Sequence, residues 1–73
     1  MTKETDLAMA ERYQAEAERI EEDVRETESR LSHFAPDSQK SIDWVLGEKR
    51  TAVKALLGVA EWHRERAKLQ EGT

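Results

Sequence analysis

Apolar residues recur at alternating intervals of three and four through the first half of this chain. The positions are Ala10, Tyr13, Ala17, Ile20, Val24, Thr27, Leu31 and Phe34. This is the a/d spacing of a coiled coil, and it puts these side chains on one narrow stripe of an α-helix. Nearly every other residue between them is charged, polar or small. The pattern therefore predicts a helix over about residues 5–32 that packs against a single partner.

A proline ends this periodicity and divides the chain. Pro36 disfavours helix at Ala35 and cannot lie inside a continuous helix. Asp37 or Ser38 would be a good N-cap for a second helix. The loop over about residues 33–37 is short, and short connections between helices give antiparallel neighbours. The expected fold class is all-α: an antiparallel helical hairpin that forms one domain over residues 1–73.

A second helix is expected over about residues 38–70, and it carries more apolar surface than one neighbour needs. A main stripe about 160° wide faces the first helix. The stripe consists of Ile42, Val45, Leu46, Ala52, Val53, Leu56, Leu57, Val59, Ala60, His63 and Ala67. A second line, roughly opposite, consists of Trp44, Thr51, Ala55, Gly58, Trp62 and Leu69. A two-helix chain cannot easily cover both.

The chain is also short for a domain that folds alone. With 73 residues and no cysteine, it is near the lower limit for a self-sufficient core and has no disulfide or thiolate metal site to stabilise it. A second hairpin would cover the wide face of the second helix. We therefore expect a two-fold symmetric homodimer that forms a four-helix bundle, since closed two-fold pairs are the commonest assemblies.

The line that holds both tryptophans is the candidate partner-binding surface. Trp44 and Trp62 are about five turns apart on one side of the helix, at roughly 3.6 residues per turn. Thr51, Ala55 and Gly58 lie between them, which would leave a shallow groove for a ridge of another helix. Tryptophan is enriched among binding hot spots. The alternative is that one tryptophan folds back over the edge of the intramolecular core.

Three residues break the apolar or helical character of the second helix. Lys49 lies in the middle of the main stripe, where its ammonium must reach solvent or pair with a carboxylate. A polar group at such a position can fix register and oligomeric state, which is the role expected for Lys49. Gly47 and Gly58 each cost a helix about 1 kcal/mol relative to alanine. They either permit close approach at a helix crossing or are simply tolerated.

The two halves of the chain differ in charge. Residues 1–37 carry five basic and eleven acidic groups, a net charge of −6, whereas residues 38–73 carry seven and five, a net charge of +2. The halves should attract when they lie side by side. The acidic first half disfavours nonspecific binding to a phosphate backbone, so nucleic acid is not the expected partner.

No motif for catalysis or cofactor binding is visible. The sequence has no Gly-x-Ser-x-Gly, no phosphate-binding glycine-rich loop and no spaced Ser, His and Asp, so no catalytic residue is expected. Neither His33 nor His63 follows a carboxylate by three residues, and no metal or other cofactor is expected.

Without a motif for catalysis or cofactor binding, the functional classes that remain are soluble binding proteins. No apolar run approaches the roughly 20 residues that span a bilayer, and the first residues do not resemble a signal peptide, which predicts a cytoplasmic protein without membrane contact. The expected function is a non-enzymatic protein-interaction module, such as an adaptor, structural subunit or small inhibitor, that docks a protein partner through the second helix. The alternative is a small nucleic-acid-associated regulator that uses the basic part of that helix.

Overall fold

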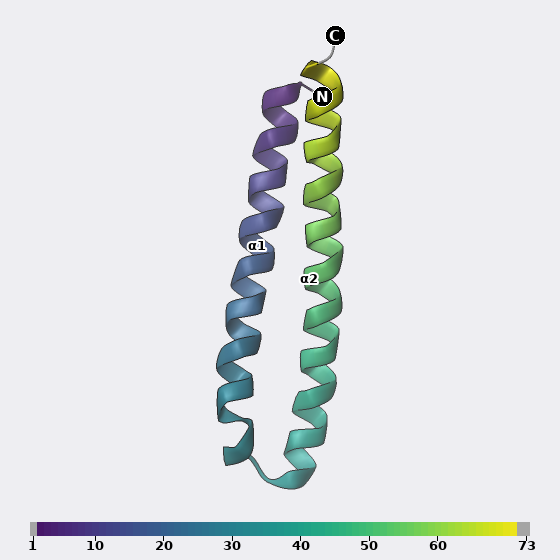
Figure 1. The fold of residues 1–73 in the computed structure, drawn as a ribbon. Coiled ribbons are helices and arrows are strands. Elements are labelled where there is room, and N and C mark those ends of the chain that lie inside the picture. Colours follow the sequence, from purple (N-terminus) through teal and green to yellow (C-terminus); the bar gives the residue numbers. More distant parts are fainter. Residues whose placement is uncertain (1, 72–73) are drawn as a thin grey trace.

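Two long helices lie antiparallel in the computed structural model, which describes residues 2–71 (Figure 1). Helix α1 spans Lys3–Arg30, a short 3-10 helix spans Leu31–His33, and α2 spans Pro36–Glu71. The part of the chain that the structure describes contains no strand. The predicted all-α helical hairpin is confirmed. Below, the loop end is the end with the turn, and the open end is where α1 starts and α2 finishes.

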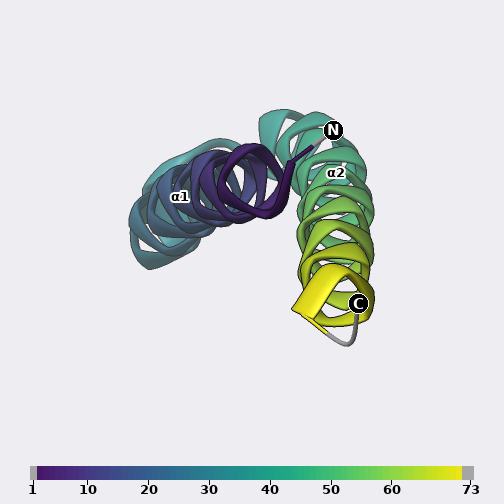
Figure 2. The same cartoon turned by 90° about the horizontal axis from the view of Figure 1, so that it is seen from above.

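The hairpin is a rod with dimensions of 57 × 15 × 13 Å. Viewed from above, the two helix axes are inclined to one another and not parallel (Figure 2). The rod exposes 5404 Å², against about 4,600 Å² for a compact monomer of this mass. The hairpin thus leaves more of its surface uncovered than a globular fold of equal size. No helix within residues 2–71 is both long and apolar enough to cross a bilayer.

The helices meet along one narrow seam. From Ala10 in α1 to Leu31 in the 3-10 helix, every position of the predicted pattern is buried or half-buried, whereas Phe34 lies beyond the 3-10 helix and is exposed. On α2, besides the half-buried Gln39, Leu57, Arg64 and Arg66, nine buried or half-buried positions follow the same alternation of three and four. We call these positions the first seam of α2: Ile42, Leu46, Lys49, Val53, Leu56, Ala60, His63, Ala67 and Gln70.

Helix α1 covers only part of the main stripe predicted on α2. Val45 and Val59 are 42% and 39% exposed, and Ala52 between them is exposed as well. The reason is geometric, because a coiled-coil partner touches two columns of positions, an arc narrower than a stripe of about 160°. The third column therefore stays at the surface.

The start of α1 differs slightly from the sequence prediction. The helix begins at Lys3, two residues before the expected start, because Thr2 caps it. The Thr2 hydroxyl accepts a hydrogen bond from the backbone N–H of Thr5 at 3.2 Å. A threonine oxygen at this position satisfies an amide that has no acceptor within the helix.

The start of α2 corrects a prediction. The helix begins at Pro36, so the proposed N-cap at Asp37 or Ser38 is wrong. Proline suits the first position of a helix, since its φ is already helical and no intrahelical acceptor exists there for an N–H. The backbone N–H of Gln39 donates to the carbonyl of Ala35 at 2.9 Å, which closes the first turn.

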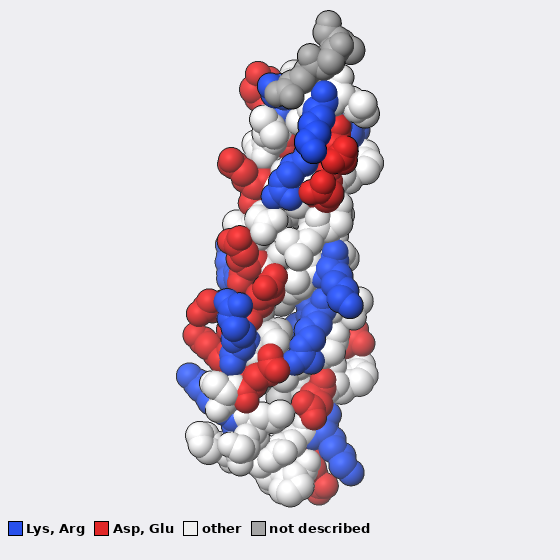
Figure 3. Space-filling view, in the orientation of Figure 1, with Lys and Arg blue, Asp and Glu red and all other residues white. Residues whose placement is uncertain are grey.

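Opposite charges meet across the seam, as the charge of the two halves leads one to expect. Lys49 of α2 forms an ion pair with Asp23 of α1. Arg50 of α2 forms another with Glu28 of α1, in which the guanidinium nitrogen is 2.8 Å from the carboxylate oxygen. Figure 3 shows acidic groups gathered mainly over α1 and a column of basic groups over α2 beside them. These pairs are exposed enough that each contributes little, about 0.2–1 kcal/mol, but together they favour this pairing of the two helices.

Candidate functional site

Both tryptophans lie on the surface of the hairpin. Trp44 is 69% and Trp62 is 51% exposed, and Leu69 near the open end is 73% exposed. Trp62 nevertheless touches the edge of the core, because its ring lies edge-on to the buried ring of His63, with the centroids 4.8 Å apart. The guanidinium of Arg66 lies over the Trp62 ring, 4.8 Å from the ring centroid. Trp62 is therefore fixed in place while half of it faces solvent.

The exposed apolar residues of α2 form a second regular seam. Each of its positions comes one residue before a position of the first seam. We call this the second seam: Val45, Glu48, Ala52, Ala55, Val59, Trp62, Arg66 and Leu69. The six apolar members are all exposed. Since one residue turns an α-helix by about 100°, the second seam faces roughly a quarter turn away from α1.

The predicted partner-binding residues divide between the second seam and the column beside it. Ala55 and Trp62 belong to the second seam. Trp44, Thr51 and Gly58 form the adjacent column, on the side of α2 that faces away from α1, and all three are exposed. The predicted set is therefore one continuous surface, with the second seam as its more apolar half.

The two glycines do not mark a helix crossing within the hairpin. A Cβ atom added at Gly47 or Gly58 would meet nothing within 4 Å. The Thr51 hydroxyl donates to the Gly47 carbonyl at 3.1 Å, a local contact that leaves the helix intact. The interpretation that these glycines permit close approach at a helix crossing therefore finds no support within the hairpin itself.

Lys49 holds a position of the first seam and reaches towards α1. Its ammonium donates to a carboxylate oxygen of Asp23, while the Lys49 side chain remains 38% exposed. The alkyl stem can therefore lie along the seam while the charge meets a carboxylate at its edge. Its expected role in fixing register stays a prediction.

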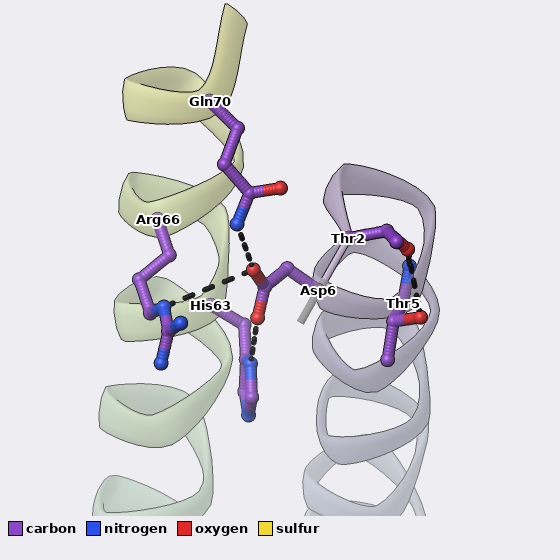
Figure 4. Close-up of polar contacts among 6 residues, drawn as sticks. All are labelled: Thr2, Thr5, Asp6, His63, Arg66 and Gln70. Carbon is purple, nitrogen blue, oxygen red and sulfur yellow. Dashed lines mark hydrogen bonds and ion pairs between the residues drawn. The ribbon is translucent and has the colours of Figure 1, made fainter.

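Sequence reasoning missed the most deeply buried polar group among the residues that the structure describes. Asp6 of α1 is 0% exposed and lies at the open end of the seam (Figure 4). Its carboxylate accepts a hydrogen bond from Nδ1 of His63 at 2.8 Å and another from the side-chain amide of Gln70 at 2.7 Å. Arg66 Nε lies 3.8 Å from the same carboxylate. We call these four residues the Asp6 cluster.

The donors around Asp6 keep its carboxylate charged. The hydrogen bond from His63 lowers the pKa of Asp6 most, and the Gln70 amide and the positive charge of Arg66 lower it further. Burial acts in the opposite direction, yet the pKa of Asp6 remains below its usual value. These donors therefore compensate the negative charge of the buried Asp6 carboxylate, so that it is not left unpaired.

A signal for the Asp6 cluster was present in the sequence. The alternation of three and four that runs from Ala10 through α1 reaches Asp6 when it is continued backwards by one step. On α2, the same alternation passes through His63 to Gln70. Polar residues at these positions imply polar partners across the seam, because a buried unpaired group is costly.

The Asp6 cluster is enclosed between the two helices, and its polar groups are directed at one another. The ring of His63 stacks on Tyr13 of α1 with centroids 5.9 Å apart, so it is held between both helices. No buried side-chain nitrogen or oxygen in the described residues lacks a partner. Within these residues, no group of three or more His, Cys, Asp or Glu could hold a metal ion. The cluster joins the two helix ends at the open end of the rod.

Comparison with known proteins identifies no relative of this chain. No protein-family model matches the sequence, and neither a curated protein nor a solved structure matches it significantly. A functional proposal must therefore come from the geometry of the hairpin itself. Its two distinctive features are the closed Asp6 cluster and the open second seam of α2.

Proposed function

We propose that this chain is a non-enzymatic protein-interaction module that docks a protein partner through the exposed apolar surface of α2. Such a module would act as an adaptor, a structural subunit or a small inhibitor. The observation that carries the proposal is the second seam, whose six apolar residues are exposed in regular coiled-coil spacing. Large contiguous apolar patches on a monomer mark interaction sites, since their burial is favourable.

Trp62 is the expected centre of the docking surface. Its contacts with His63 and Arg66 hold the ring in one orientation, so little side-chain entropy is lost when a partner covers it. Binding hot spots are enriched in tryptophan residues of this kind. Trp44 lacks such contacts among the described residues and lies beside the seam, so we expect it to contribute less.

The non-enzymatic part of the proposal is supported by the state of the titratable groups. The buried acid and histidine, Asp6 and His63, are turned towards one another between the helices. We propose the cytoplasm as the setting, because the chain has no cysteine with which to form the disulfides that stabilise many small secreted domains.

Nucleic-acid binding is the weaker alternative. The basic groups that would contact phosphates are largely engaged within the hairpin: Lys49 and Arg50 pair with carboxylates of α1, and Arg64 donates to Gln14 at 3.1 Å. Salt separates the two functions. Apolar docking should be nearly insensitive to salt, whereas binding to a phosphate backbone should weaken steeply as salt rises.

The test uses the protein's own tryptophans, both of which lie on the proposed surface. Association should shift their emission to the blue and protect them from acrylamide quenching, while sedimentation reports the mass of the complex. We expect Trp62→Ala to weaken association at least tenfold and Trp44→Ala to weaken it less, with helicity unchanged in both. A Trp62→Ala protein that melts, self-associates and binds other proteins like the wild type would overturn the proposal.

A further inference from the structure

We infer that the second seam of α2 binds the second seam of another copy of this chain, in antiparallel orientation, with the two-fold axis level with Leu57. The inference rests on the proposed function and names the partner of the same surface. Its basis is that two copies of the second seam, laid side by side in opposite directions, match each other in charge and in side-chain size.

The spacing of the second seam makes an antiparallel self-pairing complete. In a heptad repeat, each a position is followed three residues later by a d position. In an antiparallel coiled coil, the a positions of one helix face the d positions of the other. With the axis level with Leu57, facing residues are equally distant from it in the sequence. The three apolar layers, each occurring twice, pair Val45 with Leu69, Ala52 with Trp62 and Ala55 with Val59.

The fourth layer brings the two charged residues of the second seam together. It pairs Glu48 with Arg66 of the second copy, again twice. Glu48 is exposed and forms no ion pair or hydrogen bond among the described residues of its own hairpin. Arg66 lies over Trp62 and has its Nε 3.8 Å from Asp6, but its side chain is 38% exposed and stays partly accessible. Glu48 can therefore pair with the partner without losing a contact of its own hairpin, and Arg66 can reach the partner from its place over Trp62.

These charges select one orientation and one register. A parallel pairing would place Glu48 against Glu48 and Arg66 against Arg66, with repulsion in both layers. An antiparallel pairing shifted by seven residues would leave neither charge opposite the other. Only the arrangement centred on Leu57 joins opposite charges in both copies while it keeps every other layer apolar.

Side-chain size follows the same symmetry. The largest residue of the seam, Trp62, faces the small Ala52, and Val59 faces Ala55. A large side chain opposite a small one lets two helices approach without a void or a clash. The half-exposed Trp62 would thus enter a position that Ala52 leaves open.

The symmetry also determines where the first helices lie. A two-fold axis that relates two antiparallel α2 helices keeps both copies of α1 on the same side of the pair. Because the two seams of α2 are about 100° apart, each α2 touches its own α1 and the other α2 at nearly a right angle. The result is a four-helix bundle. The paired stretch from Val45 to Leu69 is about 36 Å long at roughly 1.5 Å per residue.

A charge-exchange experiment on the full chain tests the inference. Glu48→Arg alone and Arg66→Glu alone should each dimerise at least tenfold more weakly than the wild type, by sedimentation equilibrium. An equimolar mixture of the two should recover a heterodimer, because both Glu48–Arg66 layers then hold opposite charges. Glu11→Arg makes the same charge change on an exposed position of α1 outside the seams and should leave dimerisation within twofold.

A second pair of variants guards against loss of folding at Arg66. Since Arg66→Glu places a carboxylate near Asp6, circular dichroism should first establish its helicity. Independently of that variant, Arg66→Ala combined with Glu48→Arg should dimerise more strongly than Glu48→Arg alone, because the repulsion is removed. Failure of this relief would overturn the antiparallel register.

The outcomes separate this inference from the proposed function. A chain that stays monomeric into the millimolar range overturns the inference, and the proposed function then depends on whether Trp62→Ala weakens binding to a different protein. A dimer that Glu48→Arg leaves unchanged also overturns the inference, although the docking function of α2 would survive. Dimer loss in each single variant with recovery in the mixture supports both.

Discussion

Helix α2 carries two seams of the same spacing, one residue apart, and only one of them is covered. The first seam lies against α1, so Leu46 is 1% exposed and Ala60 is 0% exposed. The second seam has no neighbour in the hairpin, and Trp62 remains half exposed. The two seams share a helix and a repeat, so periodicity alone does not separate a core from an interface. The difference lies in whether the chain itself supplies the complementary helix.

The polar residues of the two seams show the same contrast. In the first seam, Lys49, His63 and Gln70 each donate to a carboxylate of α1. In the second seam, Glu48 has no partner in the described part of the hairpin, whereas Arg66 lies over Trp62 with its Nε 3.8 Å from Asp6. Where a seam is filled, its polar positions are satisfied. We propose that the unpaired Glu48 in this regular seam indicates a partner helix outside the described hairpin.

Truncation of a leucine in each seam should give the largest difference between them. Leu46→Ala should lower the free energy of unfolding by about 2–5 kcal/mol, because it removes a buried side chain and leaves a cavity. Leu69→Ala, the matched change at a residue that is 73% exposed, should alter the stability of the monomer by less than about 0.5 kcal/mol. Urea unfolding followed by circular dichroism at low protein concentration measures both. Equal losses would remove the distinction between the seams.

The Asp6 cluster should account for the next largest effect. Asp6→Asn keeps the shape of the side chain but removes the charge that His63 and Arg66 stabilise, so the melting temperature should fall. Asp37→Asn, a matched change at an exposed residue in the first turn of α2, should have little effect. If both variants melt alike, the cluster contributes nothing to the hairpin.

Acid should weaken the first seam in a way that depends on Asp6. The pKa of Asp6 is lower in the folded hairpin than in the unfolded chain, so between these two values the unfolded chain binds more protons. The stabilisation is thus complete above about pH 4, the usual carboxyl pKa, and is lost as the pH falls through the lower value of the folded state. Urea titrations from neutral pH to about pH 2 should show the stability of the wild type approaching that of Asp6→Asn. A constant difference between them across that range would contradict the assignment.

Glycine replacement should give the smallest effect, and one of opposite sign. Gly58→Ala should stabilise the hairpin by up to about 1 kcal/mol, because alanine has the higher helix propensity and its Cβ meets nothing within 4 Å. Gly47→Ala should behave in the same way and is the matched control within α2. Thermal unfolding measures the gain. A Gly58→Ala variant that is more stable as a monomer but fails to associate would show that the partner of α2 needs close approach at this position.

Much of the fold could be predicted from the sequence because it depends on local spacing. The pattern from Ala10 to Leu31 identifies the buried side of α1, and Pro36 identifies the break, so the hairpin follows. The precise start of α2 could not be obtained in this way, because Asp37 and Ser38 are also good capping residues. The choice of Pro36 became visible only with the backbone hydrogen bond between Gln39 and Ala35.

The sequence by itself determined that α2 has more apolar surface than one helix can cover and that both tryptophans lie outside the main stripe. Only the tertiary structure decided which columns α1 covers, leaving Val45, Ala52 and Val59 at the surface with Trp62. It also brought Asp6 to His63, two residues separated by 57 positions in the chain. The physical reason is that side-chain periodicity is a property of a single helix. Coverage and polar pairing depend on the register between two helices, which is set when they pack.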